Sequence, residues 1–525
     1  MAKAIMVQGT ASHVGKSILV TALCRIFRQD GYRVVPFKAQ NMALNSFVTA
    51  DGGEMGRAQV LQAQAAGLEP AVEMNPVLLK PTGNAASQVI VLGKPVGNMS
   101  ARDYHLGKNQ DLLGIIEETL RRLHREYEII VIEGAGSPAE VNLKERDLAN
   151  MRVSRLAGAP VLLVADIDRG GALAAVVGTL ALLEPEEAEQ VRGIVINKFR
   201  GDRSLLDPAL EFLEARTGKP VLGVLPYLQG LRLPAEDSVC LEEADTAAEG
   251  ELEIAVLYLP RISNFTDFDS LALEPGVRLR YVKDGEPLGS PDLVIIPGTK
   301  NTTEDLLYLY ETGYAAAVRR AAAQGIPVCG ICGGYQMLGR ELRDVEHSES
   351  FRDELPGLGL LDVVTTFVGE KILARARGEV CGGGPLFQEI AGLPVAGYEI
   401  HMGRTVLGEG TRPLLRVVER EGGGGGDFDG AVAPSGLVWG TYFHGIFDND
   451  LLRAHLLGWL RRRRGLSQGT LEEKAGGGRG STCLERELDR LAGAYRAHLN
   501  LEKIYALLGL PGPRLPRPGA GGGPK

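Results

Sequence analysis

Two cysteines, Cys329 and Cys332, stand close together in the segment GIPVCGICGGYQMLG. Cys332 lies at the centre of a G-x-C-x-G turn between an apolar run and an amphipathic run, a pattern that holds a nucleophile on a strained strand-to-helix turn. A redox C-x-x-C pair would place its first cysteine at a helix N-terminus, and a zinc site would need further ligand pairs at suitable spacing. The segment therefore predicts that Cys332 is a nucleophile and that Cys329, inside the apolar run, is a buried core residue.

A cysteine nucleophile needs a base, which is usually a histidine brought near by the fold. His444 in LVWGTYFHGIFDN follows a late apolar run and is our first candidate, and His401 in GYEIHMGRT is the second. The run PDLVIIPGTKNT ends at a glycine turn. We expect the backbone N–H groups of Gly298 and Gly333 to form an oxyanion hole beside the nucleophile.

A glycine-rich loop stands near the N-terminus, in VQGTASHVGKSILVTALCRIF. It follows an apolar run and precedes an amphipathic one, as a phosphate-binding loop must. Lys16 is placed to reach the terminal phosphates and Ser17 to bind Mg²⁺. The spacing departs from the usual G-x-x-x-x-G-K-[ST] pattern, because Thr10 stands where the first glycine would fall. We predict a nucleotide site that contains Gly9, Thr10, Gly15, Lys16 and Ser17.

Three acids and one amide are further candidates for this site. Glu133 ends the apolar run EIIVIEG, at the strand end where doubly wound sheets bind ligands, and is a candidate second Mg²⁺ ligand. Asp51 and Glu54 in DGGEMGRAQ either complete the metal shell or lie in a surface turn. Asn197 in GIVINKF resembles the start of an N-K-x-D base-reading loop that lacks its Asp, so adenine contact there stays open.

These residues need two α/β domains to position them. Short apolar runs alternate with amphipathic stretches over residues 1–235, which predicts βαβ units and a doubly wound parallel sheet with a P-loop. Residues 236–250 form an acidic linker, and residues 251–455 form a second α/β series. We expect residues 456–525 to hold an exposed Gly/Arg-rich insertion, a helix and a disordered tail. The runs assigned to the first sheet are KAIMVQG, YRVVPF, SQVIVLG, YEIIVIEG, APVLLVAD, VRGIVINK and PVLGVLPY.

Composition narrows the class of protein. The chain has 525 residues, of which 44% are hydrophobic and 23% charged, with a formal net charge of -9. The acidic balance argues against general nucleic-acid binding. No apolar run approaches the ~20 residues that span a bilayer, and the N-terminus lacks the pattern of a signal peptide. Scattered cysteines favour a reducing compartment. We expect a cytoplasmic protein with a small-molecule substrate and no nucleic-acid or membrane partner; a homo-oligomer is compatible with the sequence.

The motifs also carry a resemblance. GICGGYQMLG and TYFHG resemble the class I glutamine amidotransferases, which use Cys and His to release ammonia from glutamine, and GTASHVGKS resembles the variant P-loop of dethiobiotin synthetase and its relatives, which phosphorylate carboxylates. A chain with the P-loop motif first and the amidotransferase motifs second closely resembles the cobyric acid synthase family of vitamin B12 biosynthesis. Four further segments share the resemblance: FKAQNMALNS, DGGEMGRAQ, NPVLLKP and GYEIHMG. The resemblance covers residues 1 to about 455, and the segment LDRLAGAYRAHL also fits. It implies a flavodoxin-like second domain and a ligase that uses ATP, Mg²⁺ and glutamine.

The reaction implied by the resemblance is amidation of the b, d, e and g carboxylates of adenosylcobyrinic acid a,c-diamide through acyl phosphates. Cys332 would form a glutamyl thioester and His444 would protonate the departing ammonia. Many class I amidotransferases carry a Glu two residues after the histidine, but here that position is Ile446 and the nearest acid is Asp448. We therefore predict a Cys–His pair in which backbone carbonyls, rather than Asp448, orient the imidazole.

Two rival functions remain open on the sequence. One is the sister enzyme, cobyrinic acid a,c-diamide synthase, against which the block FKAQNMALNS argues by resemblance. The other is a non-catalytic P-loop regulator of the partition-ATPase kind, against which the intact cysteine turn argues.

Overall fold

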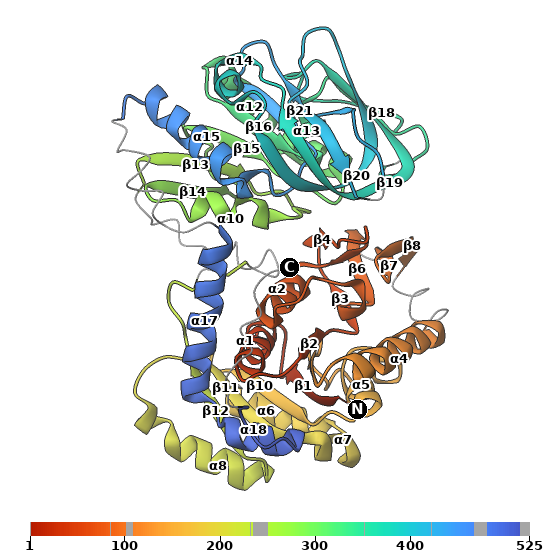
Figure 1. Ribbon diagram of the computed structural model, residues 1–525, viewed down its shortest axis with the longest axis vertical. Coiled ribbons are helices and arrows are strands. Elements are labelled where there is room, and N and C mark those ends of the chain that lie inside the picture. The colour runs from red at the N-terminus through yellow and green to blue at the C-terminus, as the bar shows by residue number, and fades with distance from the viewer. Residues whose placement is uncertain are drawn as a thin grey trace.

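The computed structural model shows two α/β domains, with the N-terminal domain at the bottom and the second domain at the top of Figure 1. The acidic linker lies outside the described residues except for Gly250, and so do most of the predicted insertion and the end of the tail. The structure describes residues 2–83, 86–100, 109–231, 233–234, 250–350, 352–421, 423–466 and 480–514.

A parallel six-stranded sheet forms the centre of the first domain, in the order β12-β11-β10-β1-β9-β2. Its strands are largely buried apolar runs, as expected where helices cover both faces. This confirms the predicted doubly wound architecture. The strands are β1 (Lys3–Gly9), β2 (Val34–Phe37), β9 (Ile129–Glu133), β10 (Val161–Asp166), β11 (Val191–Phe199) and β12 (Val221–Pro226). The helices are α1 (Lys16–Gln29), α2 (Arg57–Ala66), α4 (Asn109–Glu126), α5 (Met151–Ala157), α6 (Ala172–Leu182), α7 (Pro185–Gln190) and α8 (Asp207–Thr217).

One strand assigned to that sheet lies elsewhere. The run SQVIVLG forms β7 (Ala86–Val91), which pairs antiparallel with β6 (Val77–Gly83) and β8 (Lys94–Ser100) in a separate sheet. The prediction was wrong because β6, β7 and β8 follow one another closely, and a parallel neighbour would need a crossover of a dozen or more residues. This sheet, which β3 (Gln40–Met42) completes, and the hairpin of β4 (Ser46–Val48) with β5 (Glu54–Gly56) lie on the side of the first domain that faces the second (Figure 1).

The second domain has a sheet in the order β14-β13-β15-β16-β24-β23. Its first five strands are parallel and have the order of flavodoxin-like folds, which confirms the predicted class. A second, largely antiparallel sheet contains β17, β18, β19, β20, β21 and β22. The strands are β13 (Leu252–Leu257), β14 (Val277–Val282), β15 (Leu293–Ile296), β16 (Val328–Ile331), β17 (Glu341–Arg343), β18 (Glu354–Pro356), β19 (Val363–Val380), β20 (Pro394–Leu407), β21 (Leu415–Arg420), β22 (Phe428–Asp429), β23 (Ala431–Val432) and β24 (Val438–Thr441). The helices are α10 (Asp269–Ala272), α11 (Thr302–Glu311), α12 (Tyr314–Ala323), α13 (Gly333–Leu338), α14 (Gly384–Phe387) and α15 (Asp450–Arg463).

The C-terminal part of the chain is organised differently from the prediction. Helix α15 crosses the predicted boundary at residue 455 and packs four leucines into the core of the second domain, which therefore extends to Arg463; they are Leu452, Leu456, Leu457 and Leu460. Helices α17 (Gly480–His498) and α18 (Leu501–Leu508) return to the first domain and share its core with α1 and β12. Figure 1 shows α17 beside the first domain, and Arg25 of α1 donates to Asp489 of α17 over 2.7 Å. The start of the predicted disordered tail is also packed, since Gly512 accepts a hydrogen bond from the Tyr32 hydroxyl.

Candidate functional site

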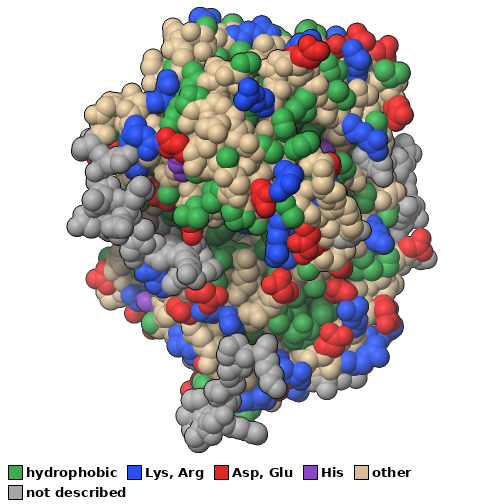
Figure 2. Space-filling model, turned by 45° about the horizontal axis from the view of Figure 1, so that its top comes forward, with side chains coloured by type: hydrophobic (Ala, Val, Ile, Leu, Met, Phe, Trp, Pro, Cys, Tyr) green, Lys and Arg blue, Asp and Glu red, His purple; other side chains and the backbone are tan. Residues whose placement is uncertain are grey.

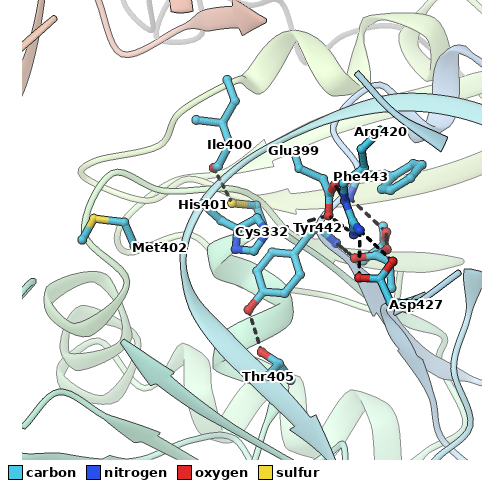
Figure 3. Close-up of polar contacts among 12 residues, drawn as sticks. Cys332, Glu399, Ile400, His401, Met402, Thr405, Arg420, Asp427, Tyr442 and Phe443 are labelled. Carbon is cyan, nitrogen blue, oxygen red and sulfur yellow. Dashed lines mark hydrogen bonds and ion pairs between the residues drawn. The ribbon is translucent and has the colours of Figure 1, made fainter. Parts of the chain in front are cut away.

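Cys332 lies on the sharp turn between β16 and α13. Its backbone is strained, with φ 52° and ψ -111°, in a region that a non-glycine residue seldom adopts. The turn also needs small neighbours, because a Cβ on Gly334 would lie 2.0 Å from the carbonyl oxygen of Ile296. The thiol donates to the Ile400 carbonyl oxygen over 3.4 Å (Figure 3). The geometry agrees with a nucleophile turn, and Cys329, fully buried in β16, has a thiol pKa raised well above its usual value by burial.

His444 lies beside this cysteine, and a third residue that the sequence analysis missed orients it. Its Nδ1 is 2.6 Å from Oδ2 of Asp267, whose other oxygen accepts the N–H of Gly445 over 3.0 Å. Asp267 lies in η4 (Phe265–Phe268), which follows the first strand of the second domain. Asp448 instead contacts the Ser270 hydroxyl. Both earlier options for orienting the imidazole, Asp448 and backbone carbonyls alone, are therefore wrong, and the group is a Cys–His–Asp triad.

The triad sets the charge of the imidazole. Burial alone would lower the pKa of His444, but the Asp267 carboxylate and the neighbouring Cys332 raise it to about 10. The ring of Tyr398 stacks on the imidazole, with centroids 5.3 Å apart and planes at 19°. At neutral pH the imidazole of His444 is therefore protonated and held in place by Asp267, so it can give a proton to a leaving amine.

His401, the second candidate base, lines the same pocket in a different setting. Its ring stacks on Tyr442 at 3.6 Å between centroids (Figure 3), and burial lowers its pKa. Among the described residues, neither ring nitrogen has a hydrogen-bond partner, and the Glu399 carboxylate is 3.9 Å from Nε2. Glu399 is instead bound by Arg420. Because Asp267 bonds His444 at 2.6 Å, whereas Glu399 lies 3.9 Å from His401 and is bound by Arg420, His444 remains the first candidate for the base.

The two predicted oxyanion-hole glycines adjoin the triad. A Cβ on Gly298 would lie 3.1 Å from Cε1 of His444 and 3.7 Å from Cβ of Cys332. Gly333 is the first residue of α13, where helix N–H groups have no partner within the helix, and a Cβ there would lie 2.7 Å from Cγ2 of Thr299. Their role as oxyanion donors stays a prediction.

The glycine-rich loop connects β1 to α1 and borders a cavity of about 1160 Å³. Lys16 donates from Nζ to the carbonyls of Ala11 and Gly136 over 2.9 and 3.1 Å, so its ammonium is already held across the loop. Gly15 has φ 95° and lies against Asn197, whose Nδ2 a Cβ would meet at 2.1 Å. Gly15, Lys16 and Ser17 line the cavity.

Three predicted nucleotide contacts support the loop instead of lining the cavity. The N–H of Thr10 donates to Val164 in β10 over 2.9 Å, which extends the sheet pairing. Gly9 lies under the loop, where a Cβ would be 2.9 Å from Nζ of Lys16. Asn197 donates from Nδ2 to the Val14 carbonyl over 2.8 Å and so holds the loop; contact with a nucleotide base stays a prediction.

The structure brings together two of the four predicted metal ligands. Ser17 Oγ donates to Oε1 of Glu133 over 2.9 Å at the edge of the cavity, and Lys38 Nζ is 2.7 Å from the same oxygen. Clustered hydroxyl and carboxylate oxygens fit the hard-ligand preference of Mg²⁺. Asp51 bonds Thr49 in a turn, and Glu54 is buried against Lys80 at 2.8 Å. Neither lines the cavity, so the structure does not bring them to Ser17 and Glu133, and a metal role for Asp51 and Glu54 stays a prediction.

Basic side chains from the segment after β9 and from the loop between β10 and α6 also line this cavity; they are Lys144, Arg146, Arg152, Arg155 and Arg169. Over the face drawn in Figure 2, acidic and basic side chains intermix without a broad field of one sign.

No helix in the part of the chain that the structure describes is long and apolar enough to cross a membrane.

Comparison with known proteins gives the same division of the chain. Residues 5–239 match a CobQ/CobB/MinD/ParA nucleotide binding domain, and residues 253–452 match a CobB/CobQ-like glutamine amidotransferase domain. A solved glutamine amidotransferase from Thermotoga maritima is 15% identical, with a TM-score of 0.27 over 50% of this chain and 99% of that one.

Two curated relatives are similar over nearly their whole length. A cobyric acid synthase of Moorella thermoacetica is 59% identical over 517 residues, covering 98% of each chain. A cobyric acid synthase of Desulforamulus reducens is 53% identical over 511 residues, covering 97% of this chain and 99% of the relative. With a nucleotide loop in one domain and a Cys–His–Asp triad in the other, the chain belongs to the cobyric acid synthase family.

Proposed function

We propose that this protein catalyses the ATP- and glutamine-dependent amidation of the b, d, e and g carboxylates of adenosylcobyrinic acid a,c-diamide in cobalamin biosynthesis. The observation that carries the proposal is the presence, in one chain, of a Cys–His–Asp triad and a lysine-bearing nucleotide loop, together with full-length similarity to cobyric acid synthases. The protein acts as a glutamine-hydrolysing carbon–nitrogen ligase. We place it in the cytoplasm, with a corrinoid as its small-molecule partner.

The glutaminase half follows from the triad. The Cys332 thiolate attacks the side-chain amide carbon of glutamine, and the oxyanion of the tetrahedral intermediate lies toward the N–H groups of Gly298 and Gly333. His444 gives its proton to the departing nitrogen, which leaves as ammonia, and the acyl group remains as a thioester. His444 then takes a proton from water, which attacks the thioester and releases glutamate. Asp267 holds the imidazole in orientation throughout.

The synthetase half follows from the loop. A carboxylate is a poor acyl donor because its leaving group would be oxide, whereas an acyl phosphate can be attacked by ammonia. Lys16, which the loop holds through the Ala11 carbonyl, would stabilise the charge that develops on the phosphoryl group transferred from ATP. Ser17 and Glu133 would hold Mg²⁺, which supplies charge neutralisation at the phosphates when bound. The basic side chains of the cavity would hold the peripheral carboxylates of the corrinoid.

The test is to incubate the purified protein with ATP, Mg²⁺, glutamine and the a,c-diamide, and to count added amides by mass spectrometry. We expect amidation of each of the four named carboxylates. If the protein left the a,c-diamide unchanged but amidated the a and c carboxylates of cobyrinic acid, the sister activity would replace this proposal.

A further inference from the structure

A backbone hydrogen bond from the first domain enters the glutaminase site of the second. The N–H of Ser46 in β4 donates to Oδ1 of Asn264 over 3.0 Å. Ser46 is 1% exposed and Asn264 is 2% exposed, so water does not compete for the bond. Asn264 lines the same pocket as Cys332 and His444. The contact therefore lies inside the site and not on the rim of the interface.

Asn264 also begins the turn that carries the orienting acid. It is the N-cap of η4, in the left-handed conformation with φ 52° and ψ 36°, which is disfavoured for residues other than glycine. Its carbonyl accepts the N–H of Asp267 over 3.0 Å. Because η4 has four residues and little stability of its own, the conformation of Asn264 contributes to the position of Asp267, together with the buried Phe265 and Phe268.

The Ser46 side of this contact is itself fixed by buried charges. Ser46 Oγ donates to Oε1 of Glu54 over 2.7 Å, and Lys80 Nζ donates to Ser46 Oγ over 2.9 Å. Lys371, on β19 of the second domain, also binds the fully buried Glu54. Burial alone would raise the pKa of Glu54, but Lys371 and Lys80 hold it well below its usual range. This cluster joins the two domains beside β4.

We propose that Asn264 is a positioning residue through which the docked first domain orients Asp267, and hence His444, for glutamine hydrolysis. The inference rests on the glutaminase half of the proposed function. If the proposal holds, ammonia is released efficiently only while β4 is docked against η4. In that arrangement the first domain, which carries the nucleotide loop, is in place to receive the ammonia.

The first test compares Asn264→Gly with Asn264→Asp in the full chain. Glycine keeps the left-handed backbone and removes the acceptor of the Ser46 N–H, whereas aspartate keeps an acceptor oxygen at the same place. For Asn264→Gly we expect kcat for glutamate release to fall about tenfold or more with a smaller change in KM. We also expect a shifted pH profile and unchanged amidation with free ammonia. Asn264→Asp should recover most of the lost kcat.

The second test removes the ion pair between the domains. Lys371→Met deletes one partner of Glu54 and leaves Lys80 in place, so Glu54 is not left alone. We expect the same direction of change, with lower glutaminase kcat and retained ammonia-dependent amidation. Lys503→Met, on the exposed face of α18, is the matched control and should change neither activity.

The outcomes separate this inference from the proposed function. Wild-type kcat and pH profile in Asn264→Gly would overturn the positioning role. An equal loss of amidation rate with glutamine and with free ammonia would also overturn the positioning role, because such a loss would show general damage to the fold. If the parent protein itself released no glutamate from glutamine, the proposed function would fail before any variant was compared.

Discussion

At the scale of single residues, the acid of the triad stands 177 positions before its histidine. The sequence places Cys332 and His444 on strand ends of one domain, which is enough to predict that they meet. It does not single out Asp267, because the segment NFTDFDS offers two acids and the short turn η4 decides which one faces His444. Ile446, at the position where many class I amidotransferases have Glu, is fully buried in the apolar core.

The first residue-scale prediction concerns this acid. Asp267→Asn keeps the size of the side chain but removes the charge that supports the imidazolium, so glutaminase kcat should fall by about 10²- to 10⁴-fold. Amidation with free ammonia should persist. Asp448→Asn is the control and should change glutaminase kcat by less than about tenfold, since Asp448 bonds Ser270. Steady-state assays of glutamate release measure both; equal losses in the two variants would contradict the assignment.

The second residue-scale prediction concerns pH. The pKa of His444 rises from 6.5 to about 10 on folding, so between these values the folded chain binds a proton that the unfolded chain has released. The stabilisation of the fold by protonated His444 is therefore fully present below about pH 6.5 and is lost as the pH rises toward 10. The difference in free energy of unfolding between the parent and His444→Gln should shrink over that window, as measured by urea unfolding at several pH values. A difference that grows with pH would contradict the sign.

At the scale of elements, periodicity identified most strands but not their partners. The run SQVIVLG is a strand as expected, yet its apolar pattern does not distinguish a parallel core strand from the antiparallel β7. The helical pattern near the C-terminus is likewise correct, but nothing in it shows that α17 and α18 return to the first domain. Long-range packing of this kind depends on surfaces that local sequence does not describe.

The element-scale prediction tests that return. Leu491 of α17 is fully buried in the core shared with α1, so Leu491→Ala should lower the free energy of unfolding of the first domain by about 2–5 kcal/mol. Both tryptophans, Trp439 and Trp459, lie in the second domain. We therefore expect an earlier urea transition by far-UV circular dichroism and an unchanged tryptophan fluorescence transition.

The matched control is Leu451→Ala, on a residue that is 69% exposed on α15, which should change stability by less than about 0.5 kcal/mol. If Leu491→Ala shifted the tryptophan fluorescence transition but not the circular dichroism transition of the first domain, α17 would belong to the second domain instead.

At the scale of the whole molecule, two chemistries on separate domains must share one nitrogen atom. The triad pocket is lined by Lys80 of the first domain as well as by residues of the second, so the site that frees ammonia already borders the domain that consumes it. The nucleotide loop belongs to the first domain alone. Each half can therefore be disabled separately by one substitution.

Tracing that nitrogen is the most direct test of the account. The protein, with ATP, Mg²⁺ and the a,c-diamide, receives glutamine labelled in its side-chain amide, and the label in the corrinoid product is read by mass spectrometry. The parent and Cys329→Ala should transfer the label. Cys332→Ser should form amides only from added free ammonia, because its glutaminase lacks the thiolate. Lys16→Ala should form almost none from either source, because acyl phosphate formation precedes ammonia attack. Label transfer by Cys332→Ser, or near-normal amidation by Lys16→Ala with ammonia, would contradict the account.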